Sequence, residues 1–113
     1  MGKDGSGGGR GSSRGRDRRL EGDLRIGHSL SRVRGRIDRI DRRIVALLAR
    51  RRGAVAEVGE IKRLLGLPVE DPRREEEIVS RIRGSGLEEE AKGYIEAVYK
   101  TIFRCSYAVE RQE

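Results

Sequence analysis

The stretch ALLARRRGAVAEVGEIK, residues 46–62, lies in a regular heptad pattern that one cation interrupts. Seam positions recur at alternating spacings of four and three residues, and Arg51 occupies one that calls for a buried aliphatic side chain. The seam consists of Val33, Ile37, Ile40, Ile44, Leu47, Arg51, Ala54, Val58, Ile61 and Leu65. This spacing predicts one long amphipathic helix whose apolar seam packs against other helices.

The ends of this helix are marked by residues that favour caps. Ser29 or Ser31 is a suitable N-cap, because a serine hydroxyl accepts a hydrogen bond from the backbone of the first turn. Gly66 adopts a left-handed C-terminal conformation easily, and Pro68 cannot continue a helix. The pattern therefore predicts a helix over about residues 30–65.

Two shorter helices are expected after it. Asp71 is a good N-cap and Pro72 suits the first helical position, while Gly84 provides a stop. A further apolar stripe at helical spacing runs over about residues 87–110. No strand-like alternation appears, so the sequence predicts an all-α fold with three helices per chain.

The first 28 residues differ in composition from the rest. They are rich in Gly, Ser and Arg and nearly lack apolar side chains, so burial cannot offset the entropy of ordering them. We expect a disordered tail over residues 1–28 and a folded domain over residues 29–113. The formal charge of the whole chain is +7, which favours an anionic partner.

The length of the first helix predicts an oligomer. A helix of 36 residues is about 54 Å long, whereas a compact domain of this folded length is about 30 Å across. The helix would overhang the rest of its own chain, yet its apolar seam continues to both ends. An intertwined homodimer, in which two long helices cover each other, is the expected solution.

Several function classes are excluded or disfavoured by composition. The single cysteine, Cys105, rules out an intramolecular disulfide and a multi-cysteine metal site, and we expect no metal. The one histidine, His28, lies at the edge of the tail. No apolar run has the length of a membrane span, and no secretory signal precedes the domain, so a cytoplasmic protein is expected.

Polar residues occur on faces that periodicity marks as inward. Arg51 lies in the seam, Arg34 and Lys62 share another heptad position, and Ser106 and Glu110 lie one turn apart beside the last apolar stripe. A seam cation can merely fix register. An excess of inward cations over acids, however, requires a counter-anion. The pattern therefore predicts an internal, positively charged cavity that binds an anionic ligand.

The motifs VRGRIDRIDRRIVALLARR, VGEIK and LPVEDPRREEEIV, followed by a helix with Ser106 and Glu110, resemble the all-helical chorismate mutases. The resemblance covers about residues 30–111. It implies rearrangement of chorismate to prephenate in phenylalanine and tyrosine biosynthesis, with no cofactor. It also implies a swapped homodimer whose sites take residues from both chains.

The resemblance further implies a role for each charged residue. Arg51, Arg34 of the partner subunit and Ser106 would bind the two substrate carboxylates. Lys62 would contact a carboxylate and the ether oxygen of the breaking bond, and Glu110 would approach that oxygen from the opposite side. A unimolecular rearrangement needs a compact substrate conformer and donors to the ether oxygen rather than a nucleophile.

The start of the second helix is implied to hold the substrate's ring hydroxyl. Asp71 would do so through its backbone and Glu75 through its side chain, with Arg74 supporting the cluster.

Glu110 departs from the pattern of several bacterial members of the family, which carry glutamine at this position. A carboxyl group donates a hydrogen bond only when protonated, so we expect activity to fall with rising pH and Glu110→Gln to flatten the profile.

Two alternatives remain open at this point. An isochorismate pyruvate-lyase shares the fold and a related site, although the ring-hydroxyl contact at Glu75 favours the mutase. A basic helical dimer that binds nucleic acid would explain the high positive charge. That alternative predicts outward cations and stacking aromatics, whereas aromatic residues make up only 4% of the chain.

Overall fold

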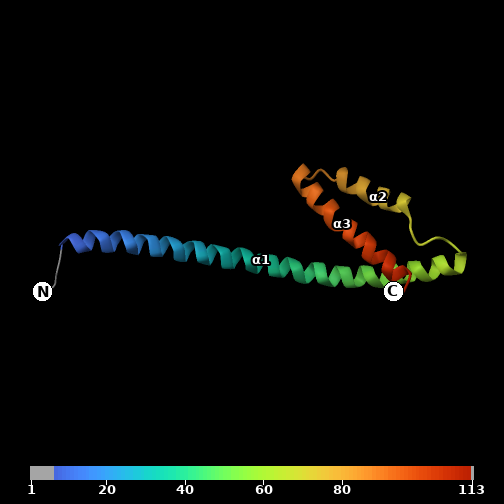
Figure 1. The fold of residues 1–113 in the computed structure, drawn as a ribbon, viewed down its shortest axis with the longest axis horizontal. Coiled ribbons are helices and arrows are strands. Elements are labelled where there is room, and N and C mark those ends of the chain that lie inside the picture. Colours follow the sequence, from blue (N-terminus) through green and yellow to red (C-terminus); the bar gives the residue numbers. More distant parts are fainter. Residues whose placement is uncertain (1–6, 113) are drawn as a thin grey trace. The chain divides into compact units, whose positions relative to one another are not determined.

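The computed structural model describes residues 7–112, with side chains from residue 17 onward. It contains three helices: α1 (Gly7–Leu65), α2 (Pro72–Arg83) and α3 (Glu89–Glu110), shown in Figure 1. Residues 7–112 contain no strand. The expected all-α class with three helices is therefore confirmed. Within the same residues, no helix combines the length and apolar character needed to cross a bilayer.

The start of α1 differs from the expected N-cap at Ser29 or Ser31. Helical backbone extends back to Gly7, through residues for which composition predicted disorder. Extension of an existing helix avoids the cost of nucleation, and this segment contains no proline and several arginines, which favour helix against the opposing effect of its glycines. Residues 1–6 lie outside the described residues, and the division into a tail and a domain stays a prediction.

The C-terminus of α1 has the expected geometry. Gly66 has a φ of 69°, in the left-handed region that glycine adopts without strain. The Leu67 N–H donates to the carbonyl of Lys62 at 2.9 Å, which satisfies a backbone acceptor at the helix end. The chain then turns towards α2, so the prediction that α1 stops at this glycine is confirmed.

Both caps of α2 were also predicted. Asp71 Oδ1 accepts a hydrogen bond from the Arg74 backbone N–H at 3.1 Å, and Pro72 occupies the first helical position. Gly84 caps the other end. The third helix begins at Glu89, two residues later than expected, and ends at Glu110 as expected.

Contacts divide the chain into two parts, Met1–Val45 and Ala46–Glu113. The second part holds residues 46–65 of α1 together with α2 and α3. Here α2 packs beside α3 (Figure 1), and α1 approaches α3 closely at Gly59. A Cβ atom at Gly59 would lie 2.8 Å from Glu110 Cα, so only glycine fits without movement of the backbone.

The second part has a small interior. Among the described side chains, those classed as buried are Phe103, 8% exposed, and Glu110, 6% exposed. The Phe103 ring also contacts the Tyr99 ring, with centroids 5.8 Å apart. A single buried apolar side chain is far less than a domain of this length needs for stability.

The apolar seam of α1 is exposed in each part considered by itself. In the first part, Ile37 and Ile40 are 48% and 54% exposed; in the second, Leu47 and Ile61 are 57% and 54% exposed. Periodicity predicted these side chains to be buried. Each part by itself leaves these side chains uncovered, so their burial requires a further surface.

Candidate active site

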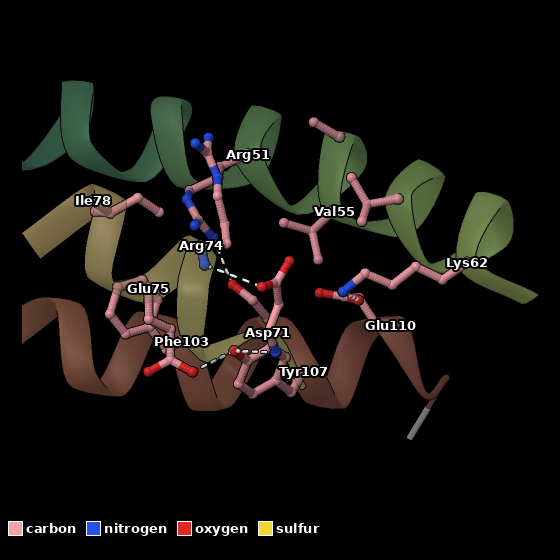
Figure 2. A pocket seen from close by; sticks show the side chains of 13 residues that line it. Arg51, Val55, Lys62, Asp71, Arg74, Glu75, Ile78, Phe103, Tyr107 and Glu110 are labelled. Carbon is pink, nitrogen blue, oxygen red and sulfur yellow. Dashed lines mark hydrogen bonds and ion pairs between the residues drawn. The ribbon is translucent and has the colours of Figure 1, made fainter. Parts of the chain in front are cut away.

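A cavity of about 400 Å³ lies within the second part, between residues 46–65 of α1 and the helices α2 and α3 (Figure 2). Of the eight residues singled out from the sequence, Arg34 is the one that does not line this cavity. The full lining is Arg51, Ala54, Val55, Val58, Lys62, Asp71, Arg74, Glu75, Ile78, Phe103, Ser106, Tyr107 and Glu110. The cavity thus brings together residues that are distant in sequence.

Arg51 occupies one end of the cavity and is partly buried. Its Nη1 donates to the Ser106 hydroxyl at 2.5 Å, and that hydroxyl donates to the Ile102 carbonyl at 2.7 Å. No carboxylate among residues 7–112 contacts the guanidinium. Because a guanidinium has five N–H donors, Arg51 keeps donors and an uncompensated positive charge for an anionic ligand.

Lys62 occupies the other end, where it forms an ion pair with Glu110. Lys62 Nζ lies 2.6 Å from Glu110 Oε1, and the two side chains are only 13% and 7% exposed. Lys62 Nζ also donates to the Val69 carbonyl at 2.6 Å. Glu110 Oε1 accepts no hydrogen bond of ordinary geometry from the described residues, so charge attraction holds it beside Lys62.

This direct contact differs from the expected arrangement, in which Lys62 and Glu110 face each other across a ligand atom. Both project into the same space in Figure 2, Lys62 from α1 and Glu110 from the end of α3. The Glu110 backbone is fixed by Gly59 and by Arg63, whose Nη1 donates to the Glu110 carbonyl at 3.0 Å. A ligand oxygen can lie between the two side chains only if the ion pair separates.

A third cluster joins the start of α2 to α3. The Tyr107 hydroxyl accepts a hydrogen bond from the Asp71 backbone N–H at 3.0 Å and donates to Glu75 Oε2. Burial of the phenol and its bond to Glu75 raise the pKa of Tyr107 to about 12. The hydroxyl therefore keeps its proton at neutral pH and acts as a donor to Glu75.

Tyr107 was missed from the sequence. It lies four residues after Phe103 and three before Glu110, so it shares a helix face with both. That spacing was the available signal. A tyrosine beside an apolar stripe is usually a packing residue, however, and its two hydrogen bonds to α2 depend on tertiary contacts.

Arg74 plays a less direct part in the geometry than expected. Its guanidinium donates to Glu77 Oε1 at 2.9 Å, on an exposed face, while its backbone N–H donates to the side chain of the N-cap residue Asp71. The cavity lining contains three cations, Arg51, Lys62 and Arg74, and three carboxylates, Asp71, Glu75 and Glu110. The predicted excess of cations is therefore wrong for the lining that one chain provides.

Arg34 belongs to the first part of the chain and is exposed there. The resemblance assigned it to the site of a partner chain, and that assignment stays a prediction.

The cavity has an apolar wall beside its charged groups, formed by Val55, Val58, Ile78 and Phe103. Such a lining suits a ligand with a hydrocarbon ring and acidic substituents. Among residues 7–112, no cluster of His, Cys, Asp or Glu has the arrangement of a metal site.

Three helices around a small cavity, with Arg51 and Lys62 at its two ends, define a helical domain suited to a small anionic molecule. Residues 33–111 match the family model described as Chorismate mutase type II, and the chain belongs to this family. The class predicted from the helix pattern and the charged positions is thus confirmed.

Curated relatives agree with the family. A protein named Chorismate mutase from Methanocaldococcus jannaschii is 46% identical over 54 residues, which is 48% of this chain and 54% of that protein. T-proteins from Enterobacter agglomerans and Haemophilus influenzae are 39% and 36% identical over 88 residues. These alignments cover 74% of this chain but 23% and 22% of the T-proteins. The chain thus spans about half of the first relative and under a quarter of the other two. No solved structure matches it.

Proposed function

We propose that this protein is a chorismate mutase, which rearranges chorismate to prephenate in phenylalanine and tyrosine biosynthesis. The observation that carries the proposal is Arg51, a partly buried cation whose cavity partner is the neutral Ser106 hydroxyl. Chorismate carries two carboxylates, an ether oxygen and a hydroxyl on a hydrocarbon ring. A planar guanidinium binds a carboxylate through two parallel hydrogen bonds, so Arg51 is the group that would anchor one of them.

The remaining charged groups are proposed to act on the ether oxygen. Negative charge builds there as the carbon–oxygen bond breaks, and a donor already held in place stabilises it. Lys62 is 13% exposed and fixed by the Val69 carbonyl, so its ammonium is held in place before the ligand arrives. Glu110 would supply a second donor when protonated. A millionfold acceleration needs about 8 kcal/mol.

The reaction proposed here requires no cofactor and no covalent intermediate. The substrate must instead be held in a compact conformer in which the two carbons that join lie close together. The apolar wall formed by Val55, Ile78 and Phe103 opposes the charged groups and would confine the hydrocarbon part of the substrate. The protein's contribution is then shape and electrostatics alone.

We also propose that the active form is a homodimer in which Arg34 of the partner subunit completes each site. The support is the exposed seam: Ile37, Ile40 and Ile61 are each about half exposed, while Phe103 is the buried apolar side chain. In a symmetric dimer the seam of each chain would cover the seam of the other, which would bury this surface. A fourth cation would also give the site the positive excess that one chain lacks. The cytoplasm remains the expected location.

The decisive experiment follows purified protein with chorismate by loss of its ultraviolet absorbance and identifies the product by chromatography. Prephenate supports the proposal, whereas no turnover by folded protein would overturn it. Isochorismate is tested in parallel, because an isochorismate pyruvate-lyase would release pyruvate from it. Faster turnover of isochorismate than of chorismate would replace the proposed activity with the lyase.

The dimer proposal has its own test. Sedimentation equilibrium is expected to give twice the chain mass, and Ile40→Asp is expected to give monomers, because a charge on the seam opposes its burial. Mixing inactive Arg34→Ala and Arg51→Ala proteins tests site sharing. Exchange of chains between them would restore sites in which both arginines are intact. No recovery of activity, with exchange demonstrated by mass, would reject shared sites.

A further inference from the structure

The hydroxyl of Tyr107 lies where the first turn of α2 meets α3. It bonds two groups of that turn, the Asp71 backbone N–H and the Glu75 carboxylate. Figure 2 shows the phenol between these groups at the edge of the cavity. These are the same two groups that the family resemblance implies as direct contacts of the substrate's ring hydroxyl. In this structure they are already joined through Tyr107.

A count of donors and acceptors shows what this bridge leaves available. A phenol has one O–H donor and accepts through its oxygen. The Tyr107 O–H donates a hydrogen bond to Glu75 Oε2, and its oxygen accepts one from the Asp71 N–H. The Asp71 N–H is therefore satisfied without a ligand. The second carboxylate oxygen, Glu75 Oε1, has no donor among residues 7–112. A ligand hydroxyl can donate to that oxygen without breaking the bridge.

The bridge also fixes where Glu75 can point. A glutamate side chain on the first turn of a helix has three rotatable bonds, and ordering it costs conformational entropy. The hydrogen bond from Tyr107, which lies on another helix, removes that freedom before a ligand binds. Groups ordered in advance bind their ligand more tightly, because the cost of ordering has already been met.

We propose that Tyr107 is a positioning residue, which holds Glu75 so that Glu75 alone accepts a hydrogen bond from the substrate's ring hydroxyl. The Asp71 backbone then acts through Tyr107 rather than on the substrate. This inference rests on the proposed mutase activity and adds a specificity determinant to it. Burial and the Glu75 bond keep Tyr107 protonated up to high pH, which preserves the bridge.

The first test compares Tyr107→Phe with Tyr94→Phe, a matched change on the same helix at a side chain that is 75% exposed. Loss of the bond to a charged group is expected to raise KM for chorismate about tenfold. The change in kcat is expected to be smaller, because the ring-hydroxyl contact exists in both ground and transition states. Tyr94→Phe is expected to match the wild type, and an unchanged KM in Tyr107→Phe would overturn the proposal.

A second test separates positioning from packing. A competitive inhibitor with the same dicarboxylate frame but no ring hydroxyl is expected to bind wild type and Tyr107→Phe equally. A hydroxylated inhibitor is expected to lose about tenfold in the variant. Equal losses for both inhibitors would show that Tyr107 only supports the cavity wall. In the double variant that also carries Glu75→Gln, the loss of affinity for the hydroxylated inhibitor should be smaller than the sum of the losses in the two single variants, because Tyr107 acts through Glu75.

A spectroscopic titration tests the inference without a measurement of activity. Phenolate absorbance should show one late ionisation near pH 12 that is absent in Tyr107→Phe. Glu75→Gln should bring it to lower pH, because the carboxylate raises the Tyr107 pKa. If Glu75→Gln leaves the late ionisation at the same pH, the hydrogen bond between Tyr107 and Glu75 is contradicted. If wild type shows no turnover while this shift occurs, the mutase proposal fails and the Tyr107–Glu75 bridge stands.

Discussion

The two ends of the cavity carry the same charge but differ in how that charge is compensated. Lys62 has an acid and a carbonyl within 2.6 Å, whereas Arg51 bonds a neutral hydroxyl. A partly buried cation without a carboxylate is costly unless an anion arrives. The Arg51 end is therefore ready to receive a ligand, and the Lys62 end must first give up an internal ion pair.

The largest expected effect comes from removing the uncompensated cation. Arg51→Ala is expected to lower kcat/KM for chorismate about 100-fold or more, because two charge-assisted hydrogen bonds are lost. Arg52→Ala, a change to the exposed neighbour, should have little effect. Steady-state kinetics of both variants measures the difference. Similar losses in the two would show that the Arg51 end is not the carboxylate site.

The next effect concerns the backbone that places Glu110 beside Lys62. Gly59→Val is expected to destabilise the fold by about 1–3 kcal/mol and to lower kcat, because its side chain would overlap the Glu110 backbone. Gly53→Val carries the same propensity cost at a helical position where a Cβ meets nothing within 4 Å. Chemical denaturation and kinetics of both variants test the close approach. Equal stability of the two would contradict it.

A smaller, pH-dependent effect is expected from Glu110→Gln. The glutamine amide donates at every pH, whereas the glutamate donates only with its proton on. Wild-type kcat/KM is therefore expected to fall with rising pH, and the variant is expected to give a flatter profile. A profile that falls equally in both proteins would remove Glu110 from the reaction.

The smallest effect is on stability at alkaline pH. The folded-state pKa of Tyr107 is raised to about 12 from its ordinary value of 10, so its contribution is complete below pH 10 and is lost as pH rises through 12. The free energy of unfolding should decline over that interval in wild type and less in Tyr107→Phe. Denaturant titrations at pH 9 and 11.5 measure this, and parallel declines would contradict a raised pKa.

Much of the fold could be predicted because its signals are local. Asp71, Pro72 and Gly66 fix helix ends through backbone chemistry that depends only on neighbouring residues. The start of α1 could not be predicted in the same way. Composition indicates whether residues 7–28 can bury a face, but not whether a helix that has already formed will continue through them.

The site was predictable to a similar degree. Arg51 was identifiable because a cation in an apolar seam breaks a long pattern, and Lys62 because its heptad position faces inward. The Lys62–Glu110 contact and the Tyr107 bridge were not predictable, since each joins different helices. Equal numbers of acids and cations in the lining were missed for the same reason: sequence periodicity does not show which acids complete the cavity.

The exposed seam of α1 makes the proposed activity depend on protein concentration. Where Arg34 of the partner subunit supplies part of each site, the catalytic unit is a pair of chains, and its abundance depends on the square of the free-chain concentration. Specific activity would then decline on dilution without any change in sequence or temperature. The expression level of the protein would then set the fraction of chains that form complete sites.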